Sequence, residues 1–138
     1  MKAFLLTALF VVAASAVSIA KAAECPITTF DGDYTQKVID AVTAEKTCES
    51  ASAVAESCAM GSTLDVQITS PALTKCEADF KAVIKKSAVL ESTYTRLQKR
   101  CGDKYAKAEG TMYRSANSFC SLNVSRLFSE LYGPQETF

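Results

Sequence analysis

The chain has 138 residues, 15 basic and 15 acidic side chains, six cysteines, and no histidine or tryptophan. This length suits one domain. The lack of histidine removes the commonest general base and a frequent zinc ligand, so an enzyme or a metal site is not expected. The balanced charge argues against a generally basic protein that binds nucleic acid.

The first 22 residues predict a cleavable signal peptide. Lys2 precedes an almost unbroken apolar run, Ala3 to Ala20, and small residues follow, which is the pattern of a secretory signal. We place cleavage after Ala22, so that one domain, residues 23–138, remains. A membrane anchor is the alternative, because about 20 apolar residues span a bilayer. The dilution of the run by alanine and serine favours cleavage and no stable membrane insertion afterwards.

Removal of residues 1–22 takes away two lysines and no acid, which leaves 13 basic and 15 acidic residues, a net charge of −2. This charge predicts no basic surface for a polyanion such as nucleic acid. Localisation in the periplasm or outside the cell follows from the signal.

All six cysteines lie beyond the predicted cleavage site: Cys25, Cys48, Cys58, Cys76, Cys101 and Cys120. An even count in a small exported chain predicts three disulfides. A metal site would favour closer pairs than these, since the closest two have nine residues between them. We therefore expect no metal and no cofactor.

Helix is the expectation nearly everywhere, because glycine and proline are few and no long alternating run is present. A first helix is predicted to start at Asp33, whose side chain can cap it, with Tyr34, Val38 and Val42 on one face. Residues 48–70 are rich in alanine, serine and threonine and are expected to form short helical turns and loop.

A long helix is predicted from Pro71 to Gly110, with Ser70 as its cap. Its buried seam consists of residues spaced three or four apart: Leu73, Cys76, Phe80, Val83, Ser87, Leu90, Tyr94, Leu97, Cys101, Tyr105 and Ala108. The seam indicates about 38 residues of uninterrupted helix. A second amphipathic helix follows, with Thr111 as a possible cap, and stops at Gly133 and Pro134.

Folding these two helices about Gly110 brings apolar positions face to face across an antiparallel hairpin. Facing positions have numbers with a constant sum, and the predicted pairs are Cys101–Cys120, Tyr105–Ala116, Leu97–Val124, Tyr94–Leu127 and Leu90–Leu131. We therefore predict an all-α, disulfide-stapled domain built on a long hairpin, residues 71–132, with a Cys101–Cys120 bond. The other four cysteines allow three pairings: Cys48–Cys58 with Cys25–Cys76, or either crossed alternative.

Charged and aromatic side chains give weak candidates for a site. The acid pairs Asp31 with Asp33 and Glu77 with Asp79 are expected at helix caps or on solvated faces, so no catalytic residue is predicted. A basic stripe is expected on the outer face of the long helix: Lys81, Lys85, Lys86, Lys99, Arg100, Lys104 and Lys107. Four tyrosines could line a pocket or an interface: Tyr94, Tyr105, Tyr113 and Tyr132.

Two segments resemble the LprI-type lysozyme inhibitor family. The first runs from Cys48 through Ala51, Ser52 and Glu56 to Cys58. The second comprises Glu109, Gly110, Thr111, Met112 and Tyr113, then Cys120, Ser121, Leu122, Val124, Arg126 and Leu131. The chain departs from the family at Leu97–Arg100, where the family has aromatic and Arg-Asp residues. It also has two additional cysteines, Cys25 and Cys76.

The resemblance implies a helical, disulfide-stapled protein of the cell envelope that inhibits lysozyme. It also implies a bond between Cys48 and Cys58, which leaves Cys25 for Cys76. A lysozyme is the expected protein partner. An envelope interaction module and a small lipid carrier are the alternatives that the residues leave open.

Overall fold

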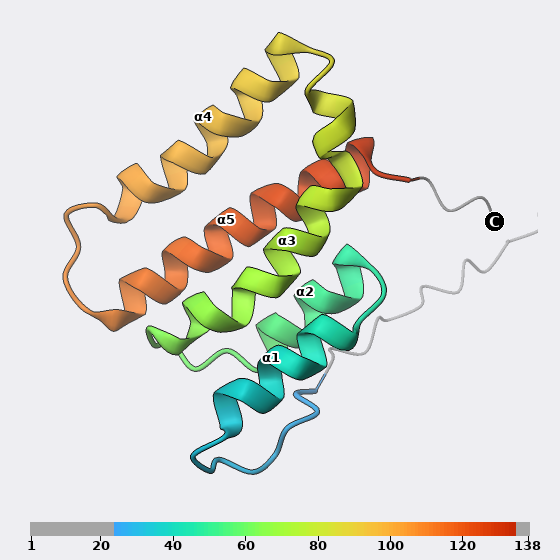
Figure 1. Ribbon diagram of the computed structural model, residues 1–138. Helices are drawn as coiled ribbons and strands as arrows, with labels where there is room; N and C mark the ends of the chain where they lie inside the picture. Colours follow the sequence, from blue (N-terminus) through green and yellow to red (C-terminus); the bar gives the residue numbers. More distant parts are fainter. Residues whose placement is uncertain (1–23, 135–138) are drawn as a thin grey trace, which may run out of the picture.

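The computed structural model describes residues 24–134, and the expected signal peptide and its cleavage site lie outside this range. The described chain is all-α, as predicted (Figure 1). Its helices are α1 (Tyr34–Ala44), α2 (Cys48–Ser57), α3 (Leu64–Ile84), α4 (Ala88–Tyr105) and α5 (Thr111–Tyr132). Within residues 24–134 no helix has the length and apolar character needed to cross a bilayer.

The helices form three successive layers (Figure 1). The first layer is α1 and α2, the middle layer is α3 and α5, and α4 lies alone on the far side. α1 and α2 pack against α3, and α2 also reaches α5. α4 contacts only α5 and α3 among the described helices, so it is the least covered element.

Two groups of buried side chains hold these layers together. The larger group joins α1, α2 and α3, and Leu122 of α5 completes it. The smaller group joins α3, α4 and α5 through Phe80, Ile84, Tyr94 and Phe128. The rings of Phe80, Tyr94 and Phe128 lie 5.1 to 5.5 Å apart in edge-on or tilted orientations, which are favourable for aromatic contacts.

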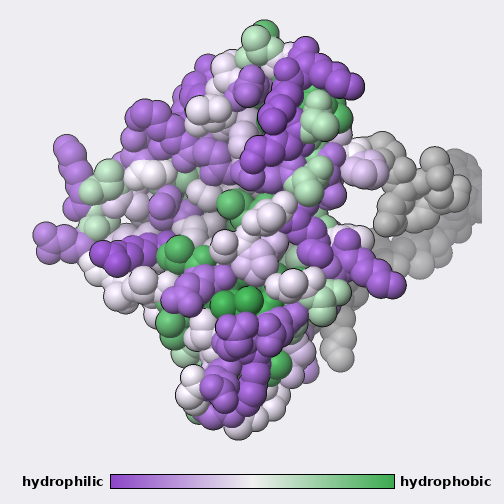
Figure 2. Space-filling view, viewed as in Figure 1, coloured by the Kyte–Doolittle hydropathy of each residue, from purple (hydrophilic) through white to green (hydrophobic). Residues whose placement is uncertain are grey.

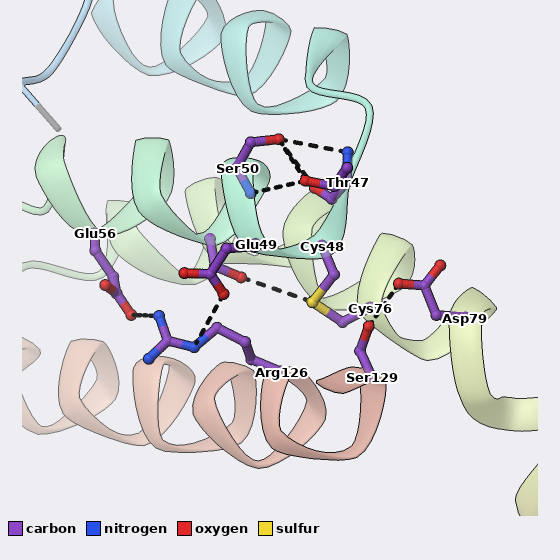
Figure 3. Close-up of polar contacts among 10 residues, drawn as sticks. Thr47, Cys48, Glu49, Ser50, Glu56, Cys76, Asp79, Arg126 and Ser129 are labelled. Atoms are coloured by element: carbon purple, nitrogen blue, oxygen red, sulfur yellow. Dashed lines mark hydrogen bonds and ion pairs between the residues drawn. A yellow bond between two sulfur atoms is a disulfide. The ribbon is translucent and has the colours of Figure 1, made fainter. Parts of the chain in front are cut away.

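α1 begins at the predicted position. Tyr34, Val38 and Val42 are buried on one face, as the spacing indicated, although the Asp33 side chain makes no capping hydrogen bond. α2 was expected only as short turns, but it is a regular helix with a capping box between Thr47 and Ser50 (Figure 3).

The predicted start of the long helix at Pro71 is wrong. α3 begins seven residues earlier, at Leu64, and Pro71 lies inside it. Proline lacks the backbone N–H that would bond to the carbonyl four residues before it, so one helical hydrogen bond is missing there. Burial of Ile68 and Thr69 against the neighbouring helices favours the helix in spite of this loss.

The long helix is also not continuous. The chain turns at Lys85–Ser87 and α4 starts at Ala88. Ser87 has extended backbone angles, and its hydroxyl accepts a hydrogen bond from the Leu90 N–H, so this residue caps a new helix. The sequence pattern concealed the break because α3 and α4 both pack on α5, which keeps the spacing of three and four on either side of the turn.

α4 and α5 run antiparallel from a corner at Gly110, which has a positive φ of 108° and caps α5 in place of Thr111 (Figure 1). Tyr94 packs on Phe128 and bonds to Ser125 rather than facing Leu127. Leu127 and Leu131 are 46% and 57% exposed, so their predicted pairing with Tyr94 and Leu90 is wrong. α5 is rotated about its own axis relative to the predicted hairpin, so that it packs against α3 as well as α4.

The described chain has three disulfides: Cys25–Cys58 within the first layer, Cys48–Cys76 between α2 and α3, and Cys101–Cys120 between α4 and α5. The third is the predicted bond, with a Cα–Cα distance of 5.7 Å. The pairing of Cys48 with Cys58 and of Cys25 with Cys76, which the family resemblance implied, is wrong. Cys48 is the first residue of the ten-residue α2 and Cys58 directly follows its last residue, so the length of the helix keeps their sulfurs apart.

Candidate functional site

The acidic pairs are structural features of the fold. Asp31 accepts a hydrogen bond from Lys37 at 2.5 Å, and this contact lowers the pKa of its carboxyl. Glu77 and Asp79 of α3 do not share a site. Asp79 accepts from the Ser129 hydroxyl of α5 at 2.6 Å (Figure 3), whereas Glu77 contacts Lys81 and Tyr94.

The hydroxyl of Tyr94 is the centre of a polar network inside the smaller core. It donates to Glu77 at 2.7 Å, and it lies 2.8 Å from the Ser125 hydroxyl and 2.9 Å from the Gln98 amide. Burial, and next the Glu77 carboxylate, raise the pKa of Tyr94 to about 12. Burial favours the neutral form of Glu77, but the hydrogen bonds from Lys81 and Tyr94 outweigh it and lower the pKa of this carboxyl. The network links α3, α4 and α5.

A fully buried acid, Asp65, organises the start of α3. Its carboxylate accepts from the Met60 and Ser62 N–H groups at 2.9 and 3.1 Å and from the Ser115 hydroxyl of α5 at 2.6 Å. These donors saturate the carboxylate at the positive end of a helix, which is where an acid is most stable. Asp65 therefore has a structural role in joining α3 to α5.

The tyrosines do not form one site. Tyr94 is core, and Tyr132 packs on Phe128. Tyr105 and Tyr113, with ring centroids 6.3 Å apart, line an open hollow of about 370 Å³ at the corner between α4 and α5. Backbone and side chains of both helices make this hollow partly polar, so it differs from the enclosed apolar chamber that a lipid carrier needs.

Charge is segregated between the two outer layers. Residues 24–63, which include α1 and α2, carry two basic and seven acidic side chains, a net charge of −5. Asp33, the residue just before α1, and Asp40 within α1 are exposed and form no ion pair with the described residues. They have the spacing of two helical turns, so they share the outer face of α1. The first layer is an acidic face.

The opposite layer is basic. Residues 85–109, which include α4, carry seven basic and three acidic side chains, a net charge of +4. Two residues of the predicted stripe are neutralised, because Lys81 pairs with Glu77 and Lys99 pairs with Asp103. Arg96 is exposed on the same helix and was absent from the prediction. The expectation of no basic surface, drawn from the net charge, is wrong because the two charges lie on different layers.

Arg126 of α5 reduces the negative charge of the acidic face next to α2. Its guanidinium lies 3.1 Å from the Glu56 carboxylate and 3.9 Å from that of Glu49 (Figure 3). These acids are therefore partly neutralised, and the unpaired negative charge concentrates on α1. Figure 2 shows one side of the molecule, where hydrophilic side chains surround several small, separate hydrophobic patches.

The chain was compared with family models, curated proteins and solved structures, and none of the three comparisons gave a match.

Proposed function

We propose that this protein is an exported inhibitor that binds a lysozyme through the acidic face formed by α1 and α2. The segregation of charge carries the proposal. Lysozymes are generally basic proteins whose cleft holds the reacting carboxylates, and a patch of opposite charge steers two proteins into an encounter. The resemblance of two segments to LprI-type lysozyme inhibitors favours this partner.

The scaffold supports binding without rearrangement. Cys25–Cys58 and Cys48–Cys76 fix α2 to the N-terminal segment and to α3, directly behind the acidic face. A surface that is rigid before binding loses little conformational entropy in the complex. The three disulfides are also consistent with an extracellular or periplasmic protein.

A muramidase assay with the purified mature protein tests the proposal. We expect inhibition of one or more basic lysozymes at micromolar concentration, and we expect it to weaken as salt is added, because salt screens exposed charges. Lysozymes of several types should be tried. Full activity of all of them at micromolar excess of this protein would reject the proposal.

The variant Asp33→Asn/Asp40→Asn tests the acidic face. Both carboxylates are exposed, and neither forms an ion pair with the described residues, so we expect normal folding and inhibition weakened roughly three- to tenfold at low salt. The matched control is Glu91→Gln/Glu109→Gln, which removes two exposed carboxylates from the basic side. Equal weakening by the two variants would show an effect of net charge alone and would contradict the assignment to α1.

A further inference from the structure

The outer face of α4 carries a row of cations that the proposed function does not use. Arg96, Arg100 and Lys104 follow one another four residues apart on α4, with Val89 and Thr93 before them on the same side of the helix. Lys86 lies in the turn before α4 and Lys107 in the turn after it, and these seven residues together are the cationic row. The buried residues of α4, Tyr94 and Cys101, lie roughly a third of a turn around the helix from the row. Arg96, Arg100 and Lys104 are exposed, so the row is open to a partner.

The cations of the row are not neutralised. Arg96, Arg100, Lys86 and Lys107 form no ion pair with the described residues, and Lys104 lies over the Tyr105 ring, 5.2 Å from its centroid. α4 is 18 residues long, which corresponds to about 27 Å of helix. Like charges at this spacing repel one another and destabilise an isolated helix. Because no acid of the described chain pairs with these cations, an anionic partner would reduce this repulsion.

We infer that the cationic row is a binding surface for a linear acidic polysaccharide, whose carboxylate or sulfate groups pair with successive cations along α4. The arrangement is a line rather than a pocket, which fits an extended polymer with repeated charges. Guanidinium groups also match carboxylate and sulfate oxygens with two hydrogen bonds each. Disulfide-bonded proteins act where such polymers are found, outside the reducing cytosol.

Other anionic partners fit the row less well. Single-stranded nucleic acid needs aromatic side chains on which bases stack, and none is in the row. Anchoring at a bilayer surface usually combines cations with large apolar or aromatic side chains, and the row has only Val89, which is 72% exposed. The acidic face of a second copy has four acids that form no ion pair with the described residues, Glu24, Asp33, Asp40 and Glu45, and they do not repeat at the spacing of the row.

Binding to heparin and to polygalacturonate, with dextran as the neutral control, tests the inference and separates sulfate from carboxylate recognition. We expect binding of one or both acidic polymers and none of dextran, with an affinity that falls steeply as salt rises. Amide shifts in the nuclear magnetic resonance spectrum should move along residues 86–107. This experiment contains no lysozyme, so its outcome is independent of the inhibition assay.

The variant Arg96→Gln/Arg100→Gln should weaken binding roughly tenfold at low salt. It should also lower the slope of the logarithm of the binding constant against the logarithm of the salt concentration by about two, since about two fewer counterions are released. The control variant Lys46→Gln/Arg114→Gln removes two other cations that form no ion pair within residues 24–134, and it should bind like the wild type. Equal loss in both variants, no binding of either acidic polymer, or tighter binding to oligothymidylate or to phosphatidylglycerol vesicles would overturn the inference. Dimer formation at low salt, without polysaccharide binding, would overturn it in favour of a second copy.

Discussion

At the scale of single residues, two acids of α3 join it to other helices: Asp65 accepts a hydrogen bond from Ser115 of α5, and Glu77 accepts one from Tyr94 of α4. Asp65 and Glu77 look like ordinary acids on a solvated helix, and only the fold shows their partners Ser115 and Tyr94, 50 and 17 residues away. Hydrophobic spacing predicted the burial of Tyr34, Val38 and Val42 correctly, but it also predicted burial of Val83, which is 43% exposed. It carries no information on which hydroxyl will meet which carboxylate.

The hydroxyl of Tyr94 is expected to contribute measurably to stability. The variant Tyr94→Phe removes an oxygen that serves Glu77, Ser125 and Gln98 and leaves these groups with fewer partners, at a cost of about 1–3 kcal/mol. Urea unfolding measures this difference. Tyr132→Phe is the control, since its hydroxyl makes no hydrogen bond with the described residues; an equal loss in the two variants would contradict the role of the network.

Stability at high pH should also differ between the wild type and the Tyr94→Phe variant. Because the folded protein holds the pKa of Tyr94 at about 12, above the ordinary value of 10.0, deprotonation of this group favours the unfolded chain. Its contribution is complete below pH 10 and is lost as the pH rises toward 12. The wild type should therefore lose more stability than Tyr94→Phe between these values, and parallel curves would contradict the assignment.

At the scale of elements, the helical class and the Cys101–Cys120 bond could be predicted, whereas helix ends could not. Apolar residues spaced three and four apart continue through the turn at Lys85–Ser87, because α3 and α4 both pack against the same helix, α5. A serine at a seam position could be a small buried residue or a cap, and the local pattern does not distinguish the two. Pro71 similarly allowed a helix start, but tertiary packing placed it inside α3.

α4 should be the first element to detach. Among the described helices it contacts only α5 and α3, and Cys101–Cys120 is the disulfide that holds it to α5. The variant Cys101→Ser/Cys120→Ser should lower the free energy of unfolding by about 3 kcal/mol, the value for a closed loop of roughly 20 residues. Hydrogen exchange should show the largest loss of protection at residues 88–105. Uniform loss over all five helices would contradict this ranking.

At the scale of the whole molecule, the distribution of charge matters more than its sum. Residues 23–138 are nearly neutral in sum, and this net charge indicates no basic surface, although the helical spacing predicts a basic stripe. The fold places residues 24–63 and 85–109 in opposite outer layers, with α3 and α5 between them (Figure 1), so that the molecule has one acidic and one basic face. Summing charge by segment would have revealed the asymmetry, but the position of each segment in space required the structure.

This arrangement allows the two proposed partners to bind at the same time. A lysozyme on α1 and α2 and an acidic polysaccharide on α4 would be separated by the middle layer. An inhibitor held on an anionic polymer would then remain beside the surface that lysozyme attacks, without losing its inhibitory face.

The most direct test is a titration of isotope-labelled mature protein, followed by amide shifts, first with an inhibited lysozyme and then with an acidic polysaccharide. The account predicts that lysozyme perturbs residues in α1 and α2, that the polysaccharide perturbs residues 86–107, and that each set persists when both ligands are present. Perturbation of a single common surface, displacement of one ligand by the other, or no response to either would contradict it.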